Sequence, residues 1–137
     1  MPVPEPHRDH VDGFRLRVRA TPTSLAPFRE GLRDWLHRLP LSPADVFDVV
    51  LACSECLTLV IEERRRQVAL VVEVRAGLED DRLVVVTRGY GLWHESHAEP
   101  CEEPLALSLI RALMDSVEWE RHPDGQTITL VRYIRRA

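Results

Sequence analysis

Between residues 14 and 20 every second residue is apolar, and the residues between them are Arg15, Arg17 and Arg19. A period of two is typical of a β-strand with one face on the core and the other in water. Charged side chains also discourage unwanted pairing of an edge strand. The pattern therefore predicts an edge strand near the start of the fold.

Three segments, residues 24–39, 43–64 and 105–114, have apolar residues every three or four positions, the spacing of a helix with a buried side. We expect Ser24 and Ser42 to cap the first two helices, because a hydroxyl there can accept a backbone N–H. The middle segment is apolar around most of its circumference. It should therefore lie buried against a sheet.

Four further segments are rich in β-branched and apolar residues and are bounded by turn clusters, which predicts strands at residues 67–76, 82–87, 117–121 and 127–134. Residues 88–103 read as an irregular loop. The order of elements predicts an α/β (α+β) fold, a two-layer sandwich with helices on one face of a mixed, mostly antiparallel sheet. We expect residues 1–12 to form a flexible arm and residues 13–137 to form one domain.

The 137 residues include 18 Arg and no Lys against 22 acidic residues, giving a formal net charge of −4. This sign argues against nucleic acid as the main partner, and the lack of Lys excludes Schiff-base chemistry and a phosphate-binding lysine. No apolar stretch is long enough for a membrane span and no signal pattern opens the chain. We expect a cytoplasmic protein without membrane contact, whose three cysteines are free thiols.

Four short motifs follow one another along the chain in a characteristic order. They are Ser54-Glu55 on the second predicted helix, Thr87-Arg88-Gly89-Tyr90-Gly91 after a strand, Leu107 to Asp115 on the third helix, and Asp124-Gly125-Gln126-Thr127 before the last strand. Together they resemble the histidine-kinase-like (GHKL) ATPase fold, also called the Bergerat fold, in its anti-sigma-factor serine-kinase branch. The resemblance implies a family of ATP-dependent serine/threonine protein kinases.

The resemblance implies that Glu55 is at the general-base position, although a surface acid on a helix is the alternative interpretation. In the family an Asn one turn later binds Mg²⁺. This chain has Leu59 there, which offers no oxygen ligand to a hard cation. We therefore expect no metal site, and a chain without a bound cofactor where the family uses ATP and Mg²⁺.

The resemblance also implies a nucleotide site built from the family's glycine motifs. Thr87 stands where the family has the Asp that accepts the adenine amino group, a loss of about 1–3 kcal/mol of affinity. A proline turn before Ala106 replaces the Gly-rich phosphate loop, and Glu102 and Glu103 add negative charge there. If nucleotide binding is retained, its residues are Thr87, Gly89, Gly91, Ala106, Gly125 and Thr127.

These substitutions favour a bacterial regulatory protein that looks like a pseudokinase and acts through protein–protein binding. The family implies a sigma factor or an anti-sigma antagonist as partner, a role in transcription regulation, and a possible homodimer through sheet edges. The alternative is an active serine/threonine kinase that phosphorylates the antagonist, with Glu55 as base.

The cysteines have two possible roles, one in metal binding and one in core packing. His94, His97 and Cys101 could together bind zinc, although their spacing is not a standard zinc-binding pattern. Cys53 and Cys56 are three apart within the second helix, where packing in the core is the simpler explanation. A metal-binding or purely structural homodimer is the third possibility for the whole chain.

Overall fold

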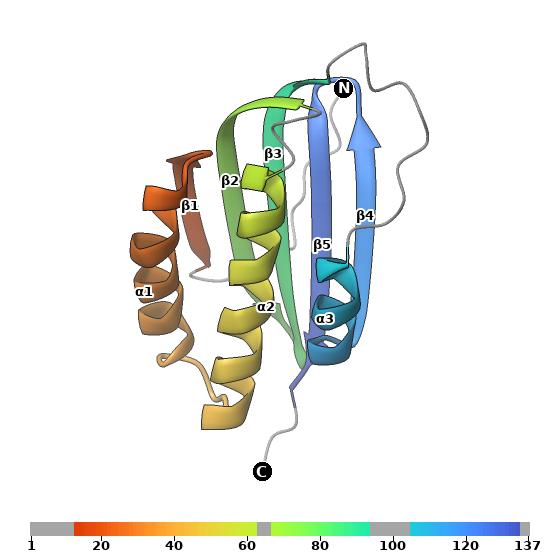
Figure 1. Cartoon of the computed structure of the whole chain (residues 1–137). Coiled ribbons are helices and arrows are strands. Elements are labelled where there is room, and N and C mark those ends of the chain that lie inside the picture. The colour runs from red at the N-terminus through yellow and green to blue at the C-terminus, as the bar shows by residue number, and fades with distance from the viewer. Residues whose placement is uncertain (1–12, 63–66, 94–104, 135–137) are drawn as a thin grey trace, which may run out of the picture.

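The computed structural model describes residues 13–62, 67–93 and 105–134. Five strands form one sheet in the order β1-β2-β3-β5-β4. The strands are β1 (Phe14–Arg19), β2 (Gln67–Glu79), β3 (Arg82–Trp93), β4 (Ser116–His122) and β5 (Gly125–Tyr133). Helices α1 (Leu25–Leu36), α2 (Pro43–Glu62) and α3 (Ala106–Leu113) cover one face of the sheet (Figure 1).

The expected two-layer fold is confirmed, with β1 at one edge of the sheet. Each neighbouring pair of described strands is antiparallel, so none of them forms the parallel pair that a mixed sheet requires. The reason lies in the connections. Short turns join β2 to β3 and β4 to β5, and short turns join only antiparallel strands. Between β1 and β2, helices α1 and α2 run in opposite directions and return the chain to the end where β1 finished (Figure 1).

The alternation of side chains gives the sheet two different faces. Apolar residues of β1, β2 and β3 face the helices, and the intervening residues face away from them. Phe14 packs against the rings of Phe28 and Trp35 on α1, with ring centroids 6.3 and 6.1 Å apart. Helix α2 lies over the centre of the sheet, where it contacts β2, β3 and β5. Its apolar circumference is explained by this position between the sheet, α1 and α3.

One of the two expected helix caps is present. The backbone N–H of Asp45 donates to the Ser42 hydroxyl oxygen at 3.1 Å, which confirms the start of α2. The expected cap by Ser24 is wrong. A 3₁₀ turn, η2 (Pro22–Ser24), precedes α1, and the Ser24 hydroxyl donates to the carbonyl oxygen of Arg19 at 2.9 Å. The turn has already placed Ser24 in helical geometry, so its side chain reaches back to β1.

The largest difference from expectation is the length of β3. Residues 88–93, expected to begin an irregular loop, continue the strand, and Gly89 pairs with Val72 of β2 and Gln126 of β5. Glycine has little intrinsic strand preference, but hydrogen-bonding partners on both sides outweigh that preference. The first two glycines of the expected site are therefore strand residues.

Arg132 on β5 links the N-terminal end of α2 and the C-terminal end of α3 to the sheet. Its guanidinium lies 2.8 Å from Asp45 and 3.2 Å from Asp48, and it donates to the carbonyl oxygen of Leu113. Burial alone would raise the pKa of Asp45. The bonds and charge of Arg132, with the Ser42 hydrogen bonds, outweigh burial, so the pKa of Asp45 is below its usual 3.8.

Candidate functional site

The candidate site begins at Gly89, in the middle of β3 on the face covered by helices. A Cβ atom at this position would lie 2.7 Å from Cγ1 of Val60 on α2 and 3.7 Å from Cγ of Gln126 on β5. The first distance is far below a normal carbon–carbon contact of roughly 3.5–4.0 Å. The missing side chain therefore lets α2 pack directly on the sheet, and Val60 occupies the space above Gly89.

Gly125 is the second glycine that the geometry requires. Its φ angle is +151°, and a Cβ atom there would lie 1.9 Å from the carbonyl oxygen of Gly89. No other residue type fits such an approach of two backbones. The structure thus brings together two glycines that the sequence placed in separate motifs.

Thr87 lies two residues before Gly89 and on the same face of β3. Its side chain is fully buried, and its hydroxyl oxygen has no hydrogen-bond partner among the described residues. Leaving a buried hydroxyl unpaired costs about 1–3 kcal/mol. Such a cost at the position of the family's adenine-binding Asp marks Thr87 as a candidate binding residue.

Gln126, which the sequence argument missed as a site residue, completes the floor of the site. It is fully buried, pairs in register with Gly89, and accepts a hydrogen bond from the indole nitrogen of Trp119 at 2.9 Å. The sequence does contain a pattern that predicts the burial of Gln126. Gln126 is the polar member of a period-two series with Ile128 and Leu130, so it must share their buried face.

The structure does not bring Thr127 to this cluster. Because successive strand residues point to opposite faces, the neighbour of Gln126 lies on the face of the sheet opposite the helices. Its hydroxyl is 3.1 Å from Nε2 of His122, and both residues line a hollow on that face. The three residues that do gather on the helix-covered face are Thr87, Gly89 and Gln126, with Gly125 beside them.

Helix α2 supplies the opposite wall. Ser54 is buried and accepts a hydrogen bond from the guanidinium of Arg29 on α1 at 3.2 Å. Glu55 follows it and is half-exposed, whereas Leu59, one turn later, is 4% exposed and belongs to the core. Thr58 has its hydroxyl bonded to the carbonyl oxygen of Ser54 at 2.9 Å. No oxygen therefore stands at the position where the family binds Mg²⁺.

Other expected residues are placed as follows. Gly91 lies in β3 opposite Ala69, and Ala106 is the first residue of α3. The proline turn with Glu102 and Glu103, and the zinc hypothesis for His94, His97 and Cys101, fall outside the described residues. Within residues 13–62, 67–93 and 105–134 no group of three or more His, Cys, Asp or Glu could hold a metal ion. Leu59, at the position where the resemblance puts the Mg²⁺ ligand, offers no oxygen.

Cys53 and Cys56 are free and buried in the core, as expected for packing residues. Burial raises the pKa of the Cys53 thiol to about 12 and that of Cys56 well above its usual value. A protonated thiol is a poor nucleophile and a poor metal ligand. Neither cysteine contributes chemistry to the site.

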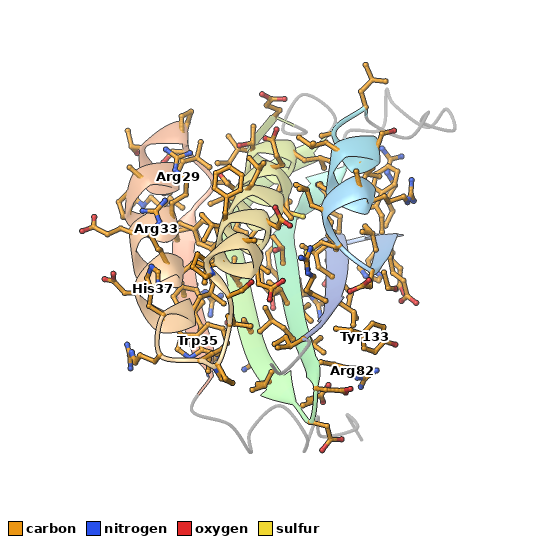
Figure 2. The ribbon with its side chains drawn as sticks, turned by 90° about the horizontal axis from the view of Figure 1, so that it is seen from below. Arg29, Arg33, Trp35, His37, Arg82 and Tyr133 are labelled. Atoms are coloured by element: carbon orange, nitrogen blue, oxygen red, sulfur yellow. The ribbon has the colours of Figure 1, made fainter. Side chains whose placement is uncertain are left out.

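One side of α1, together with the residue that follows it, carries a basic stripe, which we define as Arg29, Arg33 and His37. These residues are four apart, so they lie one above another along the helix, as Figure 2 shows. Arg29 is half-buried against Ser54, and the other two are exposed. The basic stripe therefore begins beside the residue that precedes Glu55.

Family comparison decides the identity of this arrangement. The histidine kinase-like ATPase domain family matches residues 18–132, which cover every described helix and nearly the whole sheet. The chain belongs to this family. None of the helices within the described ranges is long and apolar enough to cross a membrane.

Individual relatives agree with the family. The serine-protein kinase RsbW of Bacillus cereus strain B4264 is 22% identical over 143 residues, covering 93% of this chain and 89% of the relative. RsbW of Bacillus thuringiensis subsp. konkukian strain 97-27 gives the same figures. The structure of the RsbU and RsbW domains of Rv1364c from Mycobacterium tuberculosis superposes with a TM-score of 0.71 at 21% identity, over 90% of this chain and 32% of that one. The fold and the resemblance to the serine-kinase branch are thereby confirmed.

Proposed function

We propose that this chain is a regulatory member of the anti-sigma-factor serine-kinase branch that acts by binding a protein partner and binds ATP weakly. The observation that carries the proposal is Leu59. Its aliphatic side chain is 4% exposed and stands one helical turn after Glu55. A hard cation needs oxygen ligands, and a cation held there would meet only carbon. Glu55 would then lack the oriented phosphate that a general base requires.

The floor of the site supports the same conclusion. Thr87 offers one neutral hydroxyl where the family uses a charged acceptor, and charge-assisted hydrogen bonds are about twice as strong as neutral ones. Val60 occupies the space above Gly89. A nucleotide base would have to displace this packing before it could approach the backbone, which lowers its affinity further.

The basic stripe of α1 supports a protein partner. Arg33 and His37 are exposed, and Arg29 links the stripe to Ser54 at 3.2 Å. An acidic segment of a sigma factor or of an anti-sigma antagonist would bind there by charge complementarity. This contact requires neither metal nor nucleotide, so it survives the loss of both.

Calorimetry of the full chain with Mg²⁺ and ATP tests the nucleotide claim. We expect no saturable binding in the micromolar range for the wild type, and tighter binding for Leu59→Asn, with Leu59→Ala as the control that removes the same side chain without adding an oxygen. Stoichiometric micromolar binding by the wild type would contradict the proposal. Phosphate transfer to a serine, lost in Glu55→Ala, would establish the active kinase instead.

Binding of purified sigma factors and antagonists tests the partner claim. Arg33→Glu should weaken binding of the true partner by about tenfold or more, because reversing a rim charge turns attraction into repulsion. Arg38→Glu, just beyond the end of α1, is the matched control for net charge. Equal binding by both variants would remove the basic stripe from the interface.

A further inference from the structure

The hollow on the sheet face opposite the helices has the size of a small-molecule site. Its volume is about 690 Å³, and ligand pockets in proteins usually measure about 300–1,000 Å³. Short side chains line its centre, namely Val86 of β3 and Thr127 and Thr129 of β5, and longer charged side chains of β1, β2 and β4 surround them. The lining is mostly polar and charged, so a ligand that fills the hollow must itself carry charge.

Two guanidinium groups at one end of the hollow converge on the ring of Tyr90. The Cζ atoms of Arg17 and Arg88 lie 5.7 and 5.0 Å from the centroid of that ring. Among the described residues Arg17 has no carboxylate within ion-pair distance, and Arg88 has the exposed Asp124 at 3.9 Å. Contact with an aromatic ring holds a guanidinium in place but leaves its positive charge. Two like charges are therefore held at one point, where an anion would neutralise both.

The carboxylate that lies between these two arginines in the sheet serves other cations. Glu73 is in register with Arg17 on one side and Arg88 on the other. Its oxygens, however, lie 3.3 Å from the guanidinium of Arg15 and 3.4 Å from Nε of Arg75. This end of the hollow thus has four arginines around one carboxylate. A phosphate monoester suits it best, because its charge is close to two and its three terminal oxygens can accept from two guanidinium groups at once.

The opposite end of the hollow, on β4, is acidic. Glu118 and Glu120 line it and pair in register with Thr129 and Thr127 of β5. Glu120 lies 3.8 Å from Nε2 of His122, and within the described ranges Glu118 has no cation at ion-pair distance. Strands β3 and β4 are two steps apart in the sheet, which is about 10 Å. A ligand in the hollow therefore meets guanidinium groups at one end and carboxylates about 10 Å away.

We propose that the hollow binds a small amphoteric molecule, with a phosphate monoester at one end and an amine about 10 Å away at the other. The phosphate accepts hydrogen bonds from Arg17 and Arg88, and the ammonium group pairs with Glu118 and Glu120. Charge order gives the specificity, because the glutamates repel a molecule with anions at both ends and the arginines repel one with cations at both ends. The inference goes beyond the proposed function and does not rest on it.

Calorimetry of the full chain at low ionic strength tests the proposal with three matched probes: 6-aminohexyl phosphate, hexyl phosphate and hexylamine. We expect the first to bind with a Kd below about 1 mM, hexyl phosphate to bind about fivefold more weakly or worse, and hexylamine to show no saturable binding. Arg17→Gln and Arg88→Gln should each weaken both phosphates by about tenfold. Glu118→Gln should weaken 6-aminohexyl phosphate alone, and Arg38→Gln, just beyond the end of α1, is the control that should change nothing.

Three results would overturn the proposal. One is a wild type that shows no saturable binding of 6-aminohexyl phosphate up to about 5 mM. Another is binding that is unchanged in both arginine variants, with circular dichroism showing them folded, which would place the phosphate elsewhere on the molecule. The third is equal affinity for 6-aminohexyl phosphate and hexyl phosphate, which would remove the amine from the ligand. Because none of these readouts involves ATP or a sigma factor, failure here leaves the proposed function untouched.

Discussion

Gly89→Ala is the substitution that tests the packing of α2 on the sheet most directly. The added Cβ atom would lie 2.7 Å from Cγ1 of Val60, and it needs about 1 Å more to reach a normal contact. Val60 is fully buried and cannot turn into solvent. Overpacking of this kind costs about 1–3 kcal/mol, and alanine recovers roughly 0.5–1 kcal/mol of the entropy that glycine loses on folding. We expect a net destabilisation of about 1–2 kcal/mol.

Urea denaturation of single and double variants separates this contact from other effects. In a Val60→Ala background the clashing methyl group is gone, so Gly89→Ala should become neutral or slightly stabilising. The coupling free energy between the two positions should then be about 1–3 kcal/mol, well above the error of such cycles. Gly77→Ala is the matched control, because Gly77 lies in β2 and a Cβ atom there meets nothing within 4 Å.

Two outcomes would refute the reasoning. If Gly89→Ala is as harmless as Gly77→Ala, then α2 does not pack against β3 at this point. If Gly89→Ala costs the same free energy with and without the Val60 methyl groups, the strain comes from another neighbour. The thermal midpoint offers a second readout, with a decrease of about 3–6 °C per kcal/mol for a domain of this size.

Four further predictions concern other parts of the molecule. Gly125→Ala should destabilise the fold by about 3 kcal/mol or more, as measured by chemical denaturation. The added Cβ atom would overlap the carbonyl oxygen of Gly89, and the φ angle of residue 125 favours glycine. Arg132→Met should lower stability by about 1–2 kcal/mol, because it removes the ion pairs to the partly exposed Asp45 and Asp48 and the hydrogen bond to the Leu113 carbonyl oxygen. The pKa of Asp45 is lowered in the folded state, so its contribution to stability is present above pH 3.8. This contribution is lost as the pH falls through the lower pKa of the folded state. Between these pH values the stability of Asp45→Asn should therefore depend less on pH than that of the wild type, which an acid titration of both proteins measures. The Cys53 thiol, with its pKa near 12, should resist alkylation until the chain unfolds, and rapid labelling of the native protein would contradict its burial.

Much of the fold could be predicted because it follows from local periodicity. The alternation from Phe14 to Ala20 predicted β1 and its place at the sheet edge, and the all-round apolar character of α2 predicted its buried position. Ser42 was correctly identified as a cap, since its hydroxyl acts on a backbone group three residues away. Ser24 was not, because the neighbouring 3₁₀ turn changed its geometry.

The candidate site was predicted less completely. Thr87 and Gly89 lie on the helix-covered face, with Gly125 beside them at the start of β5. The motif argument paired them with Thr127, but strand alternation places Gln126 there and Thr127 on the face of the sheet opposite the helices. A motif records spacing along the chain, whereas the face of a strand depends on the parity of each position within the sheet.

By itself, the sequence determined the periodic elements, the family, and the absence of a magnesium-binding oxygen at residue 59, because each depends only on residue type and short-range spacing. Only the tertiary structure decided that Gly89 is a strand residue under Val60, that Gln126 and Trp119 complete the site, and that Thr127 lies on the other face of the sheet. Those features need strand order and register. Both are set by contacts between segments far apart in the chain, which no local pattern contains.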